Sequence, residues 1–301
     1  MDNKKALKKI GTQDFQGGGL LNPQQRDEFV HHVVDESAFV RNFGRVVTMS
    51  APVEEIDRLH LGERVMHHAN ESVEPGNDKL VQITSDKLTL STQEYIIIWN
   101  ESDRIAEDTI AKDGTNRTIA EMIAAQAGND LEDFALFSDT TSADADLNKQ
   151  EGFLRLLQTQ SPGSHYVTVS GVFGTSVAHT MIKAMPTKWR NKNLAFAVSE
   201  NSLQNYRNTI SQRETQLGDT QLASDSFPRL FGRPVIGIPR LSDNLAILTP
   251  MNNFVVGVHR DITRESERKP RKRSTEWTIT TRIGFGLDNS DATVWNDSLT
   301  A

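Results

Sequence analysis

A succession of short strand-like segments between Leu230 and Asp297 constrains the fold of this chain more than any other feature. The segments read LFGRPVIGIPRL, LAILTP, FVVGVHRDITRES, WTITTRIGFGLD and ATVWND, and a basic stretch separates the third from the fourth. Short runs rich in β-branched and aromatic residues, bounded by Gly, Pro, Asn and Asp, are typical of β-strands joined by turns. No cluster of catalytic residue types accompanies them, so the pattern favours a protein that works through its surfaces over an enzyme.

Composition narrows the class of protein further. The 301 residues, 37% hydrophobic and 24% charged, are enough for one large or two moderate domains. The longest aliphatic stretch, Tyr95–Trp99, has strand length and is far shorter than the roughly 18 apolar residues of a membrane span. The basic start of the chain lacks the apolar core of a signal peptide. The chain has no cysteine, which excludes disulfides, thiolate catalysis and cysteine metal sites and fits a reducing cytoplasm.

The net charge of −7 argues against a dedicated nucleic-acid-binding domain, which would normally be basic. An acidic chain repels phosphate on average, so we expect any contact with nucleic acid to be local.

The amino-terminal segment predicts an arm followed by a helix. Residues 1–21 are polar and rich in glycine, which indicates a flexible arm, and Asn22–Pro23 then supplies a helix N-cap and first-turn proline. On this helix His31 and Asp35 are four residues apart and share one face, a spacing that could hold a metal ion. No further ligand completes such a site, and the nearest candidates, His67–His68, lie in a predicted loop. We therefore interpret the pair as part of a solvated helix face.

Residues 56–93 predict a long polar hairpin. Apolar and polar residues alternate in Val81–Thr84 and Leu88–Leu90, and Glu74–Asp78 has the composition of a turn. Arms of about 16 residues would extend about 50 Å at about 3.3 Å per residue. So long and polar a ribbon has too little apolar surface to pack on its own domain, and an isolated two-stranded ribbon is marginal in water. The hairpin therefore indicates that another subunit covers it.

A strand at Tyr95–Trp99 and a short helix near 102–111 precede the longest predicted helix. Thr118 and Glu121 form a capping box that opens this helix, which runs to about Phe137 with apolar residues at every fourth position. Paired carboxylates can perform acid–base catalysis, but we interpret those of this helix as a solvated face. They are Glu121, Asp130, Glu132 and Asp133.

The next region predicts alternating strands and helices, as in a mixed α/β or α+β unit. Helices are expected at Thr175–Met185 and about Ser199–Leu217, with a buried strand at Leu194–Val198 between them. The basic run at 264–273 is the strongest nucleic-acid signal in the chain. It lacks aromatic residues for base stacking, and a solvated hairpin tip or a contact with an acidic neighbour explains it equally well.

The order of these parts resembles one family along nearly the whole chain, the tailed-phage major capsid proteins with the HK97 fold. The hairpin is similar to their extended E-loop, the long helix to their spine helix, and residues 181–219 to their axial domain. LFGRPVIGIP is similar to a recurrent phrase of the family, a Leu-x-Gly-x-Pro-Val turn into a strand. The final DATVWND resembles the strand that closes back onto the axial domain.

The resemblance implies an α+β fold of four parts. These are an N-terminal arm and helix (1–55), an extended E-loop hairpin (56–93), a peripheral domain with a long spine helix (94–150 and 251–286) and an axial α/β domain (151–250 and 287–301).

The resemblance also implies a major capsid protein without enzymatic activity or cofactor. Such a protein self-assembles as hexamers and pentamers into the icosahedral shell of a tailed phage, is located in the virion and is assembled in the host cytoplasm. Its expected partners are further copies of the chain, together with scaffolding, portal and decoration proteins. Double-stranded DNA is enclosed without sequence-specific binding, and no membrane takes part. The chain has no long N-terminal helical segment like a fused scaffolding domain, so any scaffolding protein is expected to be separate.

Opposite charges in two hairpins predict a contact between subunits. An exposed ion pair contributes about 0 to 1 kcal/mol, so such a contact would set the register of neighbouring subunits more than the strength of their association. The acidic residues are Glu63, Glu71, Glu74 and Asp78, and the basic residues are Arg271, Lys272 and Arg273.

Three other functions stay open at this stage. An encapsulin-like nanocompartment shell shares the fold, and a protein cargo in place of DNA would identify it. A DNA-binding protein using 264–273 would show steeply salt-dependent affinity. A hydrolase using the scattered histidines and carboxylates would need a pocket that joins them.

Overall fold

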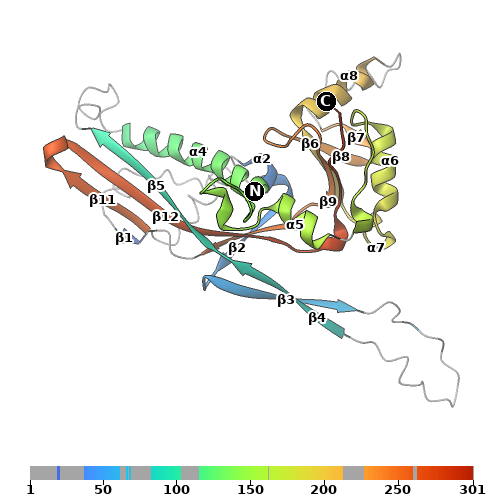
Figure 1. Ribbon diagram of the computed structural model, residues 1–301, viewed down its shortest axis with the longest axis horizontal. Helices are drawn as coiled ribbons and strands as arrows, with labels where there is room; N and C mark the ends of the chain where they lie inside the picture. Colours follow the sequence, from blue (N-terminus) through green and yellow to red (C-terminus); the bar gives the residue numbers. More distant parts are fainter. Residues whose placement is uncertain are drawn as a thin grey trace, which may run out of the picture.

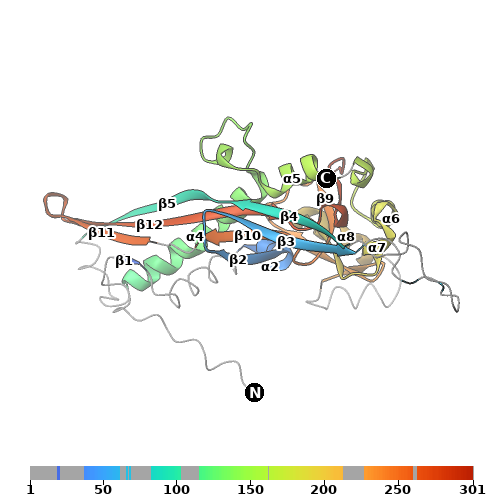
Figure 2. The ribbon, with the colours of Figure 1, turned by 90° about the horizontal axis from the view of Figure 1, so that it is seen from below.

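The computed structural model describes residues 19–20, 37–61, 66, 68, 83–102, 115–161, 163–212, 227–259 and 263–300. The body is elongated and thin, as the two perpendicular views show (Figures 1 and 2). One sheet occupies most of its length, a second sheet lies at one end, and a two-stranded ribbon leaves the body between them (Figure 1).

The long sheet has six strands in the order β1-β11-β12-β10-β2, with β5 paired to the free side of β12. β12 is antiparallel to three strands, β5, β10 and β11, whereas β2 runs parallel to β10. The strands are β1 (Gly19–Leu20), β2 (Gly44–Met49), β5 (Gln93–Ser102), β10 (Phe254–His259), β11 (Thr263–Lys269) and β12 (Ser274–Leu287).

The second sheet has five strands in the order β13-β9-β6-β8-β7, with β6 and β8 parallel. Its strands are β6 (Leu194–Ser199), β7 (Arg229–Leu230), β8 (Arg233–Ile238), β9 (Ala246–Pro250) and β13 (Val294–Asn296). β6 is buried along its whole length because the sheet separates two cores. Ala195 and Ala197 contact one core, whereas Leu194, Phe196 and Val198 contact the other. This explains the unbroken apolar run, which is typical of strands covered on both faces.

Helices cover these sheets. They are α2 (Ala38–Phe43), α4 (Thr115–Phe137), α5 (Phe153–Gln160), α6 (Thr175–Ala184), α7 (Thr187–Arg190) and α8 (Glu200–Ser211), with short 3-10 turns at Leu147–Lys149, Gly163–His165, Pro270–Lys272 and Ser290–Ala292. Local chemistry sets several ends. Ser199 caps α8 by accepting a hydrogen bond from the Ser202 amide at 3.1 Å, and α6 ends two residues before Pro186.

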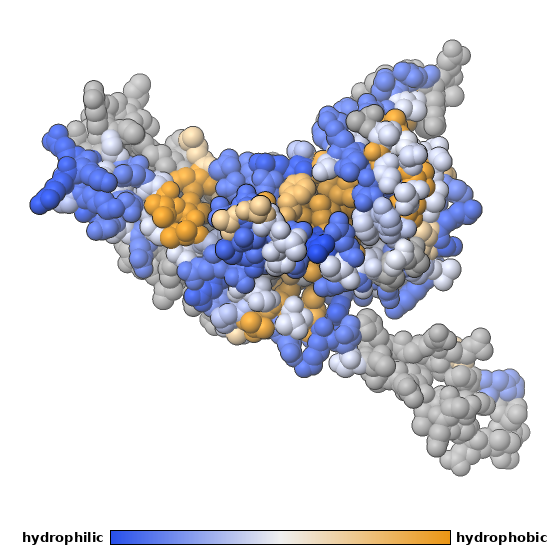
Figure 3. All heavy atoms as spheres, viewed as in Figure 1, coloured by the Kyte–Doolittle hydropathy of each residue, from blue (hydrophilic) through white to orange (hydrophobic). Residues whose placement is uncertain are grey.

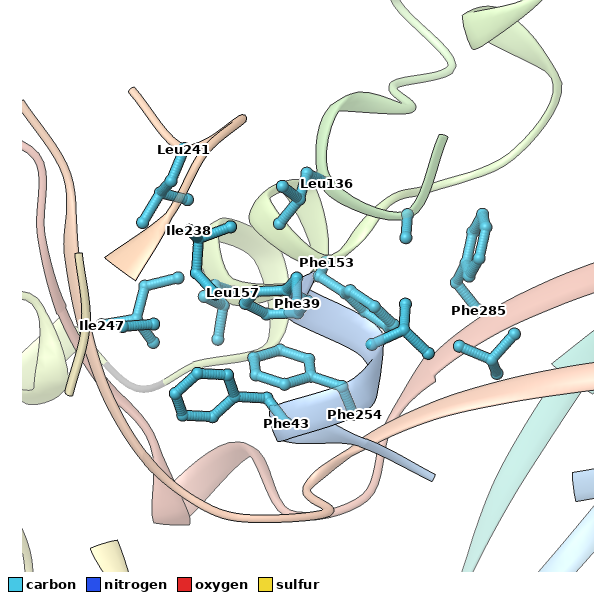
Figure 4. Packing of buried hydrophobic residues seen from close by; sticks show 14 of the residues in the cluster. Phe39, Phe43, Leu136, Phe153, Leu157, Ile238, Leu241, Ile247, Phe254 and Phe285 are labelled. Atoms are coloured by element: carbon cyan, nitrogen blue, oxygen red, sulfur yellow. The ribbon is translucent and has the colours of Figure 1, made fainter. Parts of the chain in front are cut away.

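The larger core joins the two sheets. Rings from α2, α5 and β10 meet in it, with Phe153 and Phe254 at a centroid distance of 4.6 Å and Phe39 and Phe254 at 5.0 Å (Figure 4). Ile238 and Ile247 of the second sheet pack against the same rings. The smaller core lies on the other face of the second sheet, under α6 and α8.

The structure confirms a strand at Leu194–Val198 and a helix from Thr175, and it corrects three other predictions. The long helix starts at Thr115, so Thr118 lies inside it and cannot cap it. An N-cap residue has a non-helical backbone, which Thr118 does not have. The helix extends towards Gly114 because the residues between Gly114 and Thr118 include no helix breaker. The basic run is only partly a connection, because its first residues belong to β11. The strand predicted from Phe254 to Ser266 is therefore two strands.

The strand predicted at Tyr95–Trp99 runs from Gln93 to Ser102. The predicted helix at 22–36 lies outside the described residues, as does nearly all of the one near 102–111. The carboxy-terminal end expected for α8, near Leu217, also lies outside them.

Candidate inter-subunit surfaces

The projecting ribbon is an antiparallel hairpin formed by β3 (Val53–Leu61) and β4 (Ile83–Ser91). It starts three residues earlier than the sequence predicts. The register runs from Val53 opposite Ser91 to Leu61 opposite Ile83, and the described strands extend about 30 Å. In Figure 1 the ribbon leaves the body and points away from both sheets. The predicted turn lies outside the described residues.

Ion pairs cross this ribbon on its exposed surface. Lys87 Nζ lies 2.5 Å from Glu55 Oε2, and Arg58 Nη2 lies 3.1 Å from Asp86 Oδ2. The hydrogen bond to Glu55 and its negative charge raise the pKa of Lys87. The Lys87–Glu55 pair is exposed and adds little stability, whereas the Arg58 side chain is only 18% exposed.

The base of the ribbon packs on its own subunit, contrary to the expectation that it would find no apolar contact there. Leu88 and Leu90 are buried in a small cluster with Met49 and Val255. The prediction was wrong because these two leucines share one face of β4, and the long sheet presents apolar residues to that face. Beyond this base, the ribbon meets the body in an ion pair between Arg58 and Asp288 at 3.9 Å.

Two glycines of β12 let the ribbon approach the sheet closely. A Cβ atom at Gly284 would lie 2.5 Å from the carbonyl oxygen of Ser91, and one at Gly286 would lie 2.5 Å from Leu90 Cδ2. Real Cβ contacts are essentially never this short. The two glycines of the sequence IGFGL therefore determine how closely the projecting hairpin packs against the long sheet.

The basic half of the predicted charge contact is at the tip of the β11–β12 hairpin. Arg271, Lys272 and Arg273 are all exposed there, and Arg273 adopts the left-handed conformation (φ 49°) that closes the turn. Lys269 and Glu276 form an ion pair across the same hairpin. Figures 1 and 2 place this tip at one end of the molecule. The acidic half, Glu63, Glu71, Glu74 and Asp78, lies outside the described residues, so the contact stays a prediction.

Two exposed isoleucines mark the outward face of the long sheet. Ile96 and Ile98 on β5 each retain 58% of their accessible surface, whereas Ile97 between them points inward and pairs with Ile279. Figure 3 shows an apolar area on this part of the molecule, surrounded by hydrophilic surface. α4 covers the opposite face, where the Tyr95 and Phe134 rings lie 4.6 Å apart. β5 has no second neighbouring strand within the described residues, so both its outer edge and its outer face are available to another chain.

A basic surface that the sequence reasoning missed lies at the opposite end of the molecule from the β11–β12 tip (Figure 1). We call it the α7 basic patch. Its cations come from α6, from α7 and the turn after it, and from the β7–β8 hairpin. They are Lys183, Lys188, Arg190, Lys192, Arg229 and Arg233. The signal that could have revealed it is the absence of any Asp or Glu from Gly152 to Ser199 in an acidic chain.

The carboxylates of α4 are not a uniformly solvated face. Glu132 is 3% exposed, and its Oε2 accepts hydrogen bonds from Ser37 Oγ at 3.2 Å and from the Phe39 amide at 3.3 Å. Asp133 lies 2.6 Å from Arg240. Partial burial raises the pKa of Asp133, although the Arg240 guanidinium opposes the shift. The interpretation fails for Glu132 because residues far away in sequence cover that side of the helix.

The described residues contain no group of three or more His, Asp or Glu side chains able to hold a metal ion. His31 and Asp35 lie outside this part of the chain, as does His67, whereas His68 is exposed. No helix among the described residues is both long and apolar enough to cross a bilayer.

Comparisons with known proteins find subunits of capsids and of an encapsulin. The chain is 27% identical over 309 residues, with 97% of each chain covered, to the "Putative prophage capsid protein YqbE" of Bacillus subtilis (strain 168). The fold matches a chain of the satellite phage P4 procapsid with a TM-score of 0.70 at 12% identity, covering 96% of this chain and 95% of that one. It also matches the capsid of a native GTA particle (TM-score 0.59, 14% identity, 88% and 89% coverage). A holo-SrpI encapsulin of Synechococcus elongatus PCC 7942 matches with a TM-score of 0.56 at 10% identity, covering 87% and 86%. No protein-family model matches.

Proposed function

We propose that this chain is a tailed-phage major capsid protein with the HK97 fold, which self-assembles into the icosahedral shell enclosing double-stranded DNA. The observation that carries the proposal is the agreement over nearly the whole chain between its sequence and a prophage capsid protein, and between its fold and a procapsid subunit. In this proposal the chain acts as a structural shell protein.

The mechanism of assembly in this proposal follows from the surfaces described above. The buried apolar residues of the described ribbon, Leu88 and Leu90, lie at its base, and the rest needs another surface to cover it, because a two-stranded ribbon alone is marginal in water. Ile96 and Ile98 make the exposed face of β5 apolar. Covering this face with another subunit removes apolar surface from water, which favours association. We assign the contact to neighbouring copies, with the hairpin 56–93 of one lying across the long sheet of the next.

The finer organisation is part of the same proposal. The subunits form hexamers and pentamers. The chain divides into the arm (1–55), the hairpin (56–93), the peripheral domain (94–150 and 251–286) and the axial domain (151–250 and 287–301). The two charged hairpins meet between subunits, with Arg271, Lys272 and Arg273 facing the acidic residues of the loop. Scaffolding, portal and decoration proteins are candidate partners of the shell, which is assembled in the host cytoplasm and becomes part of the virion.

Negative-stain electron microscopy of the full chain, expressed alone and together with its neighbouring phage genes, tests the proposal. Uniform icosahedral shells are expected in at least one of the two conditions. A monodisperse monomer or dimer in both conditions would contradict it.

A nanocompartment shell is the second candidate, because an encapsulin shares the fold. Purified shells treated with nuclease distinguish the two functions. Protected double-stranded DNA supports a phage capsid, whereas a co-purifying enzyme cargo in shells without DNA supports a nanocompartment.

A further inference from the structure

The α7 basic patch is unusual in an acidic protein. The chain carries a net charge of −7, yet no Asp or Glu occurs between Glu151 and Glu200 or between Asp225 and Asp243. The fold brings cations of these two segments together, because Arg233 Nη2 donates to the Arg190 carbonyl oxygen at 3.1 Å. The result is a local concentration of positive charge that the overall composition hides.

Two arginines hold the patch together through main-chain contacts. Arg190 donates from Nε to the Met185 carbonyl at 2.7 Å and from Nη2 to the Lys183 carbonyl at 2.7 Å. Arg233 Nη1 also donates to the Phe231 carbonyl at 3.4 Å. Their partners are neutral carbonyl groups, so the guanidinium charges stay uncompensated. Within the described chain, no ion pair joins any of the six cations to a carboxylate.

The side chains are available to a partner. Lys183, Lys188, Arg190, Lys192 and Arg229 are exposed. Phe231 is 52% exposed at the tip of the β7–β8 turn, where it and Gly232 both have positive φ angles (51° and 78°) that the tight turn requires. The Phe231 ring lies 6.0 Å from that of His179 on α6. The turn therefore presents an exposed aromatic ring beside the cations of the patch.

Four carboxylates of the same subunit, Asp133, Glu151, Asp243 and Asp297, have hydrogen-bond partners other than the patch cations. A dense array of unpaired cations instead matches a polymer with evenly spaced negative charge, and the phosphate backbone of duplex DNA is such a polymer.

We propose that the α7 basic patch is a non-sequence-specific contact for the phosphate backbone of double-stranded DNA and faces the interior of the shell. This inference rests on the proposed function, because that function places duplex DNA inside. It also places the end of the subunit that carries α6, α7 and the β7–β8 turn on the inner surface of the shell. The remaining acidic surface keeps the DNA from adsorbing tightly elsewhere.

The test uses the full chain as unassembled subunits, with a short fluorescein-labelled duplex DNA and fluorescence anisotropy over a range of salt concentrations. The variant Lys183→Gln/Lys188→Gln/Lys192→Gln removes three cations that donate no side-chain hydrogen bond in the described structure. The matched control Arg271→Gln/Lys272→Gln/Arg273→Gln removes the same charge from the β11–β12 tip. Circular dichroism confirms that both variants are folded.

Wild type is expected to bind with affinity that falls steeply with salt. Each lost phosphate contact lowers the slope of log K against log salt by about 0.9, so the patch variant should lose about two to three units of slope and at least about tenfold in affinity at low salt. The tip variant should stay within about twofold of wild type.

Three results would overturn the inference. They are no binding by wild type, equal losses in both variants, and tighter binding of poly-glutamate than of DNA, which would identify an acidic protein as the partner. Shell formation, scored separately by electron microscopy, reports on the proposed function, so failure of the DNA contact can be told apart from failure of assembly.

Discussion

Glu132 on α4 accepts a hydrogen bond from the side chain of Ser37, the residue that caps α2, over a separation of 95 positions in the sequence. Ser37 Oγ in turn accepts from the Val40 amide, and Glu132 also accepts from the Phe39 amide. One buried carboxylate thus connects the long helix to the segment that leads from the amino-terminal arm into β2.

Glu132→Ala is expected to destabilise the subunit by about 2 to 3 kcal/mol, because it leaves buried donors at the start of α2 without this acceptor. Glu132→Gln should cost less, since its amide oxygen can still accept. Urea denaturation of unassembled subunits measures both. Asp130→Ala on the exposed side of α4 is the control and should change the free energy of unfolding by less than about 0.5 kcal/mol. Equal effects at the two positions would refute the buried link.

Gly284→Ala should loosen the projecting hairpin from the body. The added Cβ meets the Ser91 carbonyl oxygen, a main-chain atom that cannot move away easily, and overpacking of this kind costs about 1 to 3 kcal/mol. Gly163→Ala is the matched control, because a Cβ at that position meets nothing within 4 Å. Denaturation midpoints and hydrogen exchange of β4 amides measure the effect. Unchanged protection of β4 in Gly284→Ala would contradict it.

Ile96→Thr/Ile98→Thr should reduce shell formation and leave the unassembled subunit folded. Both side chains are exposed, so the free energy of unfolding should change by less than about 0.5 kcal/mol per site, while the apolar area covered on assembly decreases. Ile97→Thr makes the same chemical change on the inward face of β5 and should instead lower stability. Sedimentation of assembled particles, together with denaturation of subunits, separates the two effects. Normal yields of shells from the double variant would remove β5 from the interface.

Arg271→Glu/Lys272→Glu/Arg273→Glu should block shell formation without unfolding the subunit. The three side chains are exposed at the hairpin tip, so reversal of their charge affects association more than folding. Electron microscopy and circular dichroism of the variant measure the two properties. Normal shells from this variant would show that the tip does not contact an acidic neighbour.

Tyr95→Phe should change how stability depends on alkaline pH. Burial, the largest cause, raises the pKa of Tyr95 above 10.0 despite the hydrogen bond from Gln150. A raised pKa means that the folded state retains the phenol proton after the unfolded state has lost it. The contribution is therefore complete below about pH 10 and is lost as pH rises through the folded pKa. Denaturation at pH 8 and at pH 10.5 should show a smaller loss for the variant than for wild type. Identical pH profiles would exclude a role for Tyr95.

The sequence by itself determined what depends on neighbours along the chain. The apolar run of β6, the cap at Ser199, the stop before Pro186 and the Phe231–Gly232 turn all follow from local chemistry. The order of such elements also indicated the family. Local patterns say less about where a strand ends when polar residues continue it, which is why the last residues of β11 were mistaken for part of a connection.

Only the tertiary structure decided which side chains are covered and which charges meet. Glu132 has the sequence context of a solvated helix face but is buried by α2, and Leu88 and Leu90 find their contacts on a sheet formed by residues 44–49 and 254–287. The α7 basic patch likewise joins cations from Lys183 to Arg233 that no short window of sequence contains. Burial and electrostatic potential are sums over all nearby atoms, and the fold brings most of those atoms from distant parts of the chain.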